Sequence, residues 1–175
     1  MSPFKHRLPA TLATARLALA APALADVPAI ARLCNNINVH KWMARLPFPY
    51  GEADARFFVE EIVPGPDELC YGLSQDGEFI GVVGLSFAGE QPPELGYWLG
   101  EPYWGKGYAT EAARVVIEAA RVAGIGQLRS RALETNAASR RVLRKAGFVE
   151  TGTMVETANN LVGRQMVLMQ LDFPS

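Results

Sequence analysis

The strongest constraint on the fold comes from residues 94–123, where a strand pattern, a glycine-rich turn and a helix pattern follow one another. The strand is predicted at Glu94 to Leu99. The helix is predicted at Ala109 to Ala123, because its charged residues are spaced three and four apart and share one solvated stripe. These residues are Glu111, Arg114, Glu118 and Arg121. A glycine-rich turn that joins a strand to such a helix is typical of an α/β fold.

The rest of the chain adds further elements around this unit. Strands are predicted at residues 12–20, 69–74, 78–87, 127–133, 148–155 and 165–173, and helices at residues 27–33, 52–62 and 136–146. The pair Asp76-Gly77 is a strong hairpin signal, and residues 40–50 are predicted to form a loop. The order is strand, two helices, three strands, helix, strand, helix and two strands. It predicts an α/β sandwich on a mixed sheet, a single domain of residues 12–175 after a tail of residues 1–11.

Composition and charge limit the partners. Seventeen basic and eighteen acidic residues leave a net charge of -1, so no overall field holds the protein on nucleic acid or on an anionic membrane. Cys34 and Cys70 show neither CxxC spacing nor the density of a disulfide scaffold, as expected of a cytoplasmic protein with reduced thiols. No cluster of His, Cys or carboxylate residues predicts a metal site. We expect a small-molecule or peptide partner, with no nucleic acid, membrane or metal, and leave a homodimer open.

The first residues share some features with a secretory signal. The basic residues 5–7 precede an Ala/Leu-rich stretch that ends in the small-residue triplet Ala23-Leu24-Ala25. Arg16 interrupts the apolar run, and the side chains of residues 14–19 alternate in a pattern closer to that of a short strand. We therefore expect a strand here rather than a signal peptide.

The glycine-rich turn from Trp104 to Ala109 is a candidate phosphate site. Backbone N–H groups left free at a helix N-terminus bind anions, and Gly105 and Gly107 permit a positive φ and close approach of a ligand. Two glycines alone are more typical of a tight loop, so the turn has to be compared with known phosphate-binding patterns.

Three such patterns share part of this turn. Gly100 to Lys106 fits G-x-x-x-x-G-K-[ST] up to the last position, where Gly107 leaves no hydroxyl for Mg²⁺, so a nucleotidase is disfavoured. The G-x-G-x-x-G of dinucleotide sites fails at Thr110 and would follow a strand that comes late in the chain. The segment Gly107-Tyr108-Ala109 supplies the last three positions of [Q/R]-x-x-G-x-[G/A], the loop of the GNAT superfamily of N-acetyltransferases.

Three segments resemble that superfamily and occur in its order. They are Gly96 to Leu99, Tyr103 to Ala112 and Asn136 to Phe148, and they look like the RimJ/RimL branch, which acetylates the N-termini of ribosomal proteins. The resemblance implies a GNAT-type, mostly antiparallel sheet flanked by helices, with acetyl-CoA as co-substrate and an amine as acceptor. It implies that the cofactor is bound by Trp98, Leu99, Trp104, Gly105, Lys106, Gly107, Tyr108, Ala109, Thr110, Asn136 and Ser139. Trp104 replaces the usual Gln or Arg, so this position can supply only its backbone amide.

The resemblance also implies roles for Asn136 and Ser139. Asn is a favoured helix N-cap, which gives both residues a purely structural explanation. Similar enzymes use the Asn to bind the pantetheine arm and the Ser near the cofactor sulfur. Many of them place a Tyr acid seven residues after the Asn, where this chain has Leu143. We expect Ser139 to protonate the departing thiolate, with Tyr97 and Tyr108 as alternatives that can equally well be packing residues.

Acetyl transfer also needs a base, because an alkylammonium group is mostly protonated at neutral pH. Glu94 is the candidate, acting directly or through water, although an exposed carboxylate at a strand end explains it equally well. A backbone amide near Leu99 is expected to bind the oxyanion. The acceptor is expected to meet Trp42, Tyr50 and Tyr97, whose rings would suit a core as well.

Two alternatives stay open at this point. The acceptor can be a protein N-terminus or a small-molecule amine, since the near-neutral charge favours neither. A CoA-binding module without transferase activity is the competing function, and Leu143 in place of the Tyr supports it.

Overall fold

The computed structural model describes residues 2–175, whose strands form one eight-stranded sheet. The strands are β1 (Thr11–Ala13), β2 (Ala18–Ala20), β3 (Glu68–Gln75), β4 (Glu78–Ser86), β5 (Glu94–Leu99), β6 (Gln127–Leu133), β7 (Val149–Val155) and β8 (Gln165–Asp172). Their order in the sheet is β1-β2-β3-β4-β5-β6-β8-β7. Neighbouring strands are antiparallel except β5 and β6, which are parallel. The predicted α/β fold with a mixed, mostly antiparallel sheet is confirmed.

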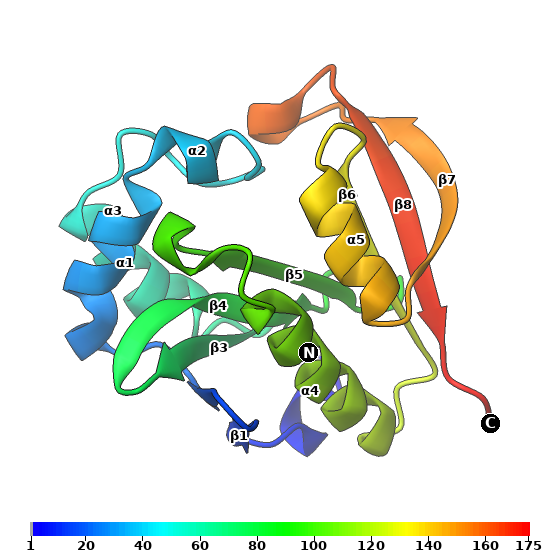
Figure 1. The fold of residues 1–175 in the computed structure, drawn as a ribbon. Helices are drawn as coiled ribbons and strands as arrows, with labels where there is room; N and C mark the ends of the chain where they lie inside the picture. Colours follow the sequence, from blue (N-terminus) through cyan, green and yellow to red (C-terminus); the bar gives the residue numbers. More distant parts are fainter. Residues whose placement is uncertain (1) are drawn as a thin grey trace.

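Helices flank the sheet, as Figure 1 shows. They are α1 (Val27–Cys34), α2 (Ile37–His40), α3 (Glu52–Phe57), α4 (Tyr108–Val122) and α5 (Ala137–Lys145). Single turns form η1 (Lys5–Arg7), η2 (Leu24–Asp26), η3 (Phe58–Ile62), η4 (Glu101–Tyr103) and η5 (Asn159–Leu161). No helix within residues 2–175 is long and apolar enough to cross a bilayer.

Local sequence explains where several elements begin and end. Asp76 and Gly77 have φ of 51° and 82°, the backbone of a two-residue hairpin between β3 and β4. The side chain of Asn136 caps α5 by accepting a hydrogen bond from the backbone N–H of Ser139, and Gly147 follows the helix with φ of 111°. These two predicted boundaries are confirmed.

Strands β5 and β6 diverge along most of their length. Among the described residues they share one pair in register, Glu94 with Arg129. Each strand keeps its other neighbour, since β5 pairs with β4 through Leu99 and β6 pairs with β8 throughout. The two strands therefore separate beyond Glu94 and Arg129 (Figure 1). We call this region the β5–β6 fork.

The two faces of β5 meet different helices, because alternate residues of a strand point to opposite sides. Leu95, Tyr97 and Leu99 pack in the larger core cluster, which includes most of the buried face of α4. Trp98 packs in a second cluster with α1 and Ala55 of α3. Glu94 and Gly96 share the face of Trp98. Strand β5 thus separates an α4 side from an α1/α3 side.

The N-terminal region differs from the prediction. The strand predicted at residues 12–20 is a hairpin of β1 and β2. The chain turns at Thr14, whose hydroxyl accepts a hydrogen bond from the backbone N–H of Leu17. Part of the predicted tail is packed, because residues 5–7 form η1 and Leu8 is buried in the larger core cluster.

Two smaller differences affect helices. The predicted loop at residues 40–50 is preceded by α2, which forms because the Asn36 side chain accepts a hydrogen bond from the backbone N–H of Asn38. The helix predicted at residues 52–62 is α-helical only to Phe57 and continues as the π-helical turn η3.

Candidate functional site

The loop Trp104–Gly107 joins η4 to α4 and is exposed. Gly105 and Gly107 have φ of 73° and 82°, a left-handed conformation that favours glycine. Gly107 is the N-cap of α4 and offers no capping side chain. The first backbone N–H groups of α4, those of Tyr108, Ala109 and Thr110, therefore have no partner within the helix by its geometry. We call residues 104–107 the glycine loop; it presents free donors and the positive end of a fifteen-residue helix.

Trp104 is tied to the end of β5. Its indole Nε1 donates a hydrogen bond to the carbonyl of Leu99 at 2.8 Å, and its side chain remains 40% exposed. The indole N–H is thus engaged with the protein, and so is the backbone N–H of Trp104, which donates to the carbonyl of Glu101 at 3.1 Å. The expectation that this position supplies its backbone amide to the cofactor does not fit the structure, because both N–H groups of Trp104 have partners within the protein.

Sequence reasoning missed Arg16, which contacts the glycine loop from the β1–β2 turn. Its Nη1 donates to the carbonyl of Lys106 at 2.9 Å, and its Nε donates to Glu111 at 2.9 Å. Its guanidinium carbon lies 4.3 Å from the centroid of the Tyr108 ring. The one available signal was that Arg16 interrupts an apolar stretch, which does not indicate a partner ninety residues away.

A pair of hydroxyl groups joins β5 to α5 across the fork. The Tyr97 hydroxyl lies 3.1 Å from Ser139 Oγ, to which it donates a hydrogen bond. Burial raises the pKa of the Tyr97 phenol above its usual value, and the hydrogen bond with Ser139 lowers it only in part. The phenol is therefore protonated at neutral pH. The sequence proposes the two residues as alternative acids, and the structure brings them together.

Asn136 and Ser139 also have the predicted capping arrangement. Asn136 Oδ1 accepts a hydrogen bond from the backbone N–H of Ser139 at 3.1 Å. The Asn136 side-chain amide has no hydrogen-bond partner among the described residues, so it keeps a donor for a ligand. Leu143 is buried to 1% exposure. The leucine side chain therefore packs in the larger core cluster.

Glu94 lies at the base of the fork in a charged cluster. Its carboxylate is 3.1 Å from Arg131 Nε and 3.6 Å from Arg129 Nε. Arg131 also pairs with Glu156 at 3.2 Å. Burial alone would raise the pKa of the Glu156 carboxyl, but hydrogen bonds from Asn159 and two backbone N–H groups, together with Arg131, lower it. The cluster contains two cations and two anions, so its formal charges cancel.

The predicted aromatic residues mostly belong to the core. Tyr50 is buried beside Trp98 in the α1/α3 cluster, and burial raises its pKa. Trp42 is half-buried and packs against Leu133, Leu161 and Met166. Tyr97 is the one of the three that reaches the fork. The structure thus favours packing for Tyr50, and the side chain of Trp98 likewise points away from the α4 side.

Gly96 is an exposed residue on an interior strand. It shares the face of Glu94 and Trp98, and no heavy atom lies within 4 Å of a Cβ built on it. The α1/α3 side of β5 is therefore open at this position. Glycine inside a strand weakens it and often marks a bulge, a bend, or the close approach of a ligand or of another backbone.

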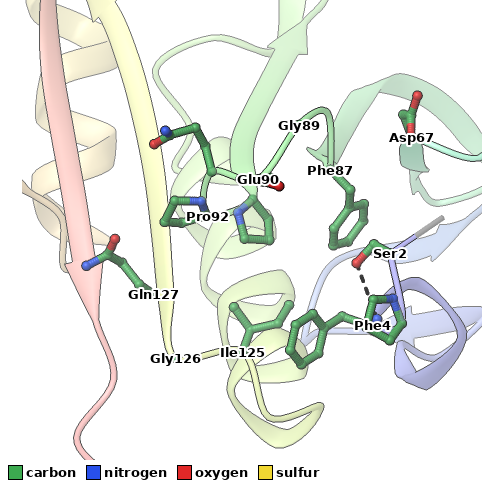
Figure 2. Close-up of a pocket in the computed structure, with 13 residues that line it drawn as sticks. Ser2, Phe4, Asp67, Phe87, Gly89, Glu90, Pro92, Ile125, Gly126 and Gln127 are labelled. Carbon is green, nitrogen blue, oxygen red and sulfur yellow. Dashed lines mark hydrogen bonds between the residues drawn. The ribbon is translucent and has the colours of Figure 1, made fainter.

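Two of the open cavities within residues 2–175 differ in how they relate to the predicted site. One of about 760 Å³ adjoins the start of α4 and is lined by residues that include Arg16, Gly107, Thr110 and Arg114. The other, about 570 Å³, is formed by the N-terminal segment, the β4–β5 turn and the start of β6, with Phe4, Phe87 and Gln127 around it (Figure 2). None of the residues predicted from the sequence to form the site lines the second cavity. Only the first therefore adjoins the predicted cofactor site.

Comparison with known proteins agrees with this geometry. The family model described as an acetyltransferase (GNAT) domain matches residues 16–149. The fold is similar to that of the microcin C7 self-immunity acetyltransferase MccE, solved with acetyl-CoA and AMP, with a TM-score of 0.81, 23% identity, and coverage of 91% of this chain and 94% of that one.

Two further solved structures have the same fold. The ribosomal L7/L12 α-N-protein acetyltransferase RimL, solved with coenzyme A, gives a TM-score of 0.80 at 19% identity, covering 95% of this chain and 97% of that one. RimJ of Mycobacterium smegmatis, solved with CoA-disulfide, gives a TM-score of 0.77 at 20% identity, covering 95% of this chain and 84% of that one. No curated protein sequence matches the chain significantly.

Proposed function

This chain belongs to the GNAT family of acetyltransferases, and from that premise we propose that it transfers an acetyl group from acetyl-CoA to a primary amine by direct attack in a ternary complex. The observation that carries the proposal is the fork itself. A loop with free backbone donors follows β5, a half-buried hydroxyl pair spans the fork, and a carboxylate and an exposed glycine lie on the opposite face. Acetyl-CoA supplies the activated acetyl thioester.

The glycine loop and the start of α4 are the proposed phosphate site. Backbone N–H groups at the start of a long helix bind phosphate oxygens well, and the exposed Lys106 adds a positive charge. The Asn136 side-chain amide is the proposed donor to the pantetheine arm. The left-handed Gly107 leaves the backbone uncovered where a phosphate has to approach it closely.

The proposed acid is Ser139, supported by Tyr97. When the C–S bond breaks, the thiolate takes the Ser139 proton, and Ser139 recovers one from the Tyr97 hydroxyl with which it is paired. Because burial raises the pKa of Tyr97, the phenol is protonated at neutral pH and carries the proton that Ser139 recovers after the C–S bond breaks. This pair supplies the hydroxyl that Leu143 cannot.

The proposed base is Glu94, acting through a water molecule. It lies on the α1/α3 side, opposite Tyr97, so that base and acid approach the reacting carbon from different faces of β5. The base takes the proton that leaves the amine nitrogen as its bond to the acetyl carbon forms. Ion pairs with Arg131 and Arg129 fix the orientation of the carboxylate.

The proposed acceptor route passes over Gly96. The open space above this residue and its position on the face of Glu94 support entry from the α1/α3 side. Likeness to RimL, named as an α-N-protein acetyltransferase, leads us to include N-terminal peptides among the acceptors to be tested, beside small amines.

A two-stage experiment tests the proposal. Acetyl-CoA at about 100 times its Kd should stabilise the protein by about 2.7 kcal/mol, which raises Tm by roughly 5–10 °C for a chain of this length. Release of free thiol should then appear with at least one member of a panel of N-terminal peptides and small amines. Absence of the thermal shift would contradict the cofactor assignment. A shift without turnover on any acceptor would favour the CoA-binding module instead.

A further inference from the structure

We propose that Arg16 is a positioning residue of the phosphate site, which holds the glycine loop in place and adds its own free guanidinium edge to the site. The proposal rests on the proposed function, because it concerns the same cofactor. It assigns a role in cofactor binding to the β1–β2 turn, about ninety residues before the loop in the sequence.

The guanidinium of Arg16 contacts the loop and the helix at three points. Nη1 donates to the Lys106 carbonyl at 2.9 Å, within the loop itself. Nε donates to Glu111 in the first turn of α4, also at 2.9 Å. The guanidinium lies over the Tyr108 ring, with its carbon 4.3 Å from the ring centroid, within the range of a cation–π contact. One planar group thus connects the two parts of the anion site.

Glu111 is a potential obstacle to phosphate binding that Arg16 offsets. A carboxylate in the first turn of a helix interacts favourably with the dipole, but it places a negative charge beside the phosphate position. Burial alone would raise the pKa of Glu111, whereas hydrogen bonds from Thr14 and Arg16 and the charge of Arg16 lower it. The carboxylate is therefore ionised. Its Oε2 accepts hydrogen bonds from Thr14 Oγ1 at 2.5 Å and from the Arg16 backbone N–H at 3.2 Å, and its Oε1 accepts the one from Arg16 Nε.

The remaining edge of the guanidinium faces the loop. Nη2 has no hydrogen-bond partner among the described residues, and a Cβ built on Gly107 would lie 3.3 Å from it. The Arg16 side chain is 42% exposed and lines the 760 Å³ cavity together with Gly107 and Thr110. Nη2 is thus a free, positively charged donor at the point where the backbone donors of α4 begin.

Lysine could not reproduce this arrangement. An ammonium group is a single point charge, whereas Arg16 places two donors at fixed angles on Lys106 and Glu111 while its guanidinium lies over the Tyr108 ring. Arg16→Lys therefore keeps the charge and loses the geometry. This makes it a graded test beside Arg16→Gln, which loses both.

The experiment measures acetyl-CoA binding and steady-state kinetics in three variants. Arg16→Gln should weaken acetyl-CoA binding about tenfold, the effect of one lost charge-assisted contact, and should raise the KM for acetyl-CoA while kcat stays within about twofold. Arg16→Lys should fall between Arg16→Gln and wild type. The matched control is Arg121→Gln, which removes another exposed arginine paired with a glutamate on the same helix, Glu118 at 2.6 Å, and should bind as wild type does.

The dependence of binding on salt separates a direct charge effect from a structural one. Wild-type affinity should fall more steeply with ionic strength than that of Arg16→Gln, because salt screens the Arg16 charge that the variant lacks. A merely structural role of Arg16 would leave the slope unchanged. Equal slopes, wild-type affinity in Arg16→Gln, or a loss confined to kcat would overturn the proposal. If Arg16→Gln does not fold, Arg16→Lys decides: wild-type affinity there overturns it. A wild-type protein that does not bind acetyl-CoA would contradict the proposed function itself.

Discussion

Gly107 offers the sharpest single perturbation of the cofactor site. Its φ of 82° lies in the left-handed region, as does the φ of 79° at Gly163 in the turn before β8. An L-residue in this region costs about 1–2 kcal/mol, and the lower entropy of the unfolded chain returns about 0.4–1 kcal/mol when alanine replaces glycine. Gly107→Ala and Gly163→Ala should therefore each destabilise the protein by about 1 kcal/mol, which lowers Tm by roughly 2–4 °C.

The two variants should differ in cofactor binding. At Gly107 a methyl group would lie 3.3 Å from Arg16 Nη2 and would cover the backbone at the start of α4, whereas a Cβ at Gly163 meets no atom within 4 Å. We expect acetyl-CoA affinity to fall at least tenfold, about 1.4 kcal/mol, in Gly107→Ala and to stay unchanged in Gly163→Ala. Titration calorimetry with acetyl-CoA, with thermal unfolding of both proteins, measures this. Equal affinities in the two variants would refute the placement of the phosphates at the glycine loop.

Three further predictions concern the acid, the acceptor and the core. Ser139→Ala and Tyr97→Phe should each lower kcat about 10- to 100-fold with little change in acetyl-CoA affinity, at or below the usual effect of a general acid; single-turnover thiol release measures it, and a loss of binding instead would contradict the assignment. Gly96→Val should raise the acceptor KM or abolish turnover while the thermal shift by acetyl-CoA persists, and unchanged kinetics would exclude this route. Burial raises the pKa of the Cys34 and Cys70 thiols from 9.0 to about 12, so as pH rises the unfolded state releases these protons before the folded state does. The contribution of the two thiols to the free energy of unfolding should therefore be full below pH 9 and fall as pH rises from 9 towards 12. Urea unfolding that gives equal stability at pH 8 and pH 11 would contradict this prediction.

The sequence was sufficient for elements whose signals are local. The limits of β5, the hairpin at Asp76-Gly77 and the cap of α5 at Asn136 all depend on residues within a few positions of each other, and the structure confirms them. The glycine loop was found in the same way, because positive φ at Gly105 and Gly107 is a property of glycine itself.

The contacts that organise the site were beyond local reasoning. Arg16 reaches Lys106 and Glu111 because the β1–β2 hairpin folds beside α4, and no spacing in the sequence indicates that approach. Tyr97 and Ser139 were each proposed separately, but their hydrogen bond depends on how α5 packs across the fork. Residue periodicity is the same for an aromatic side chain that lines a pocket and for one in the core, so the burial of Tyr50 is visible only in the structure.

A crystal structure of the protein with bound coenzyme A tests the central claim most directly. We predict that the pyrophosphate oxygens accept hydrogen bonds from backbone N–H groups between Gly105 and Thr110, and that the thiol lies in the fork beside Ser139. Coenzyme A bound elsewhere, for example in the cavity between the N-terminal segment and β6, or with its thiol away from the Tyr97–Ser139 pair, would contradict the account.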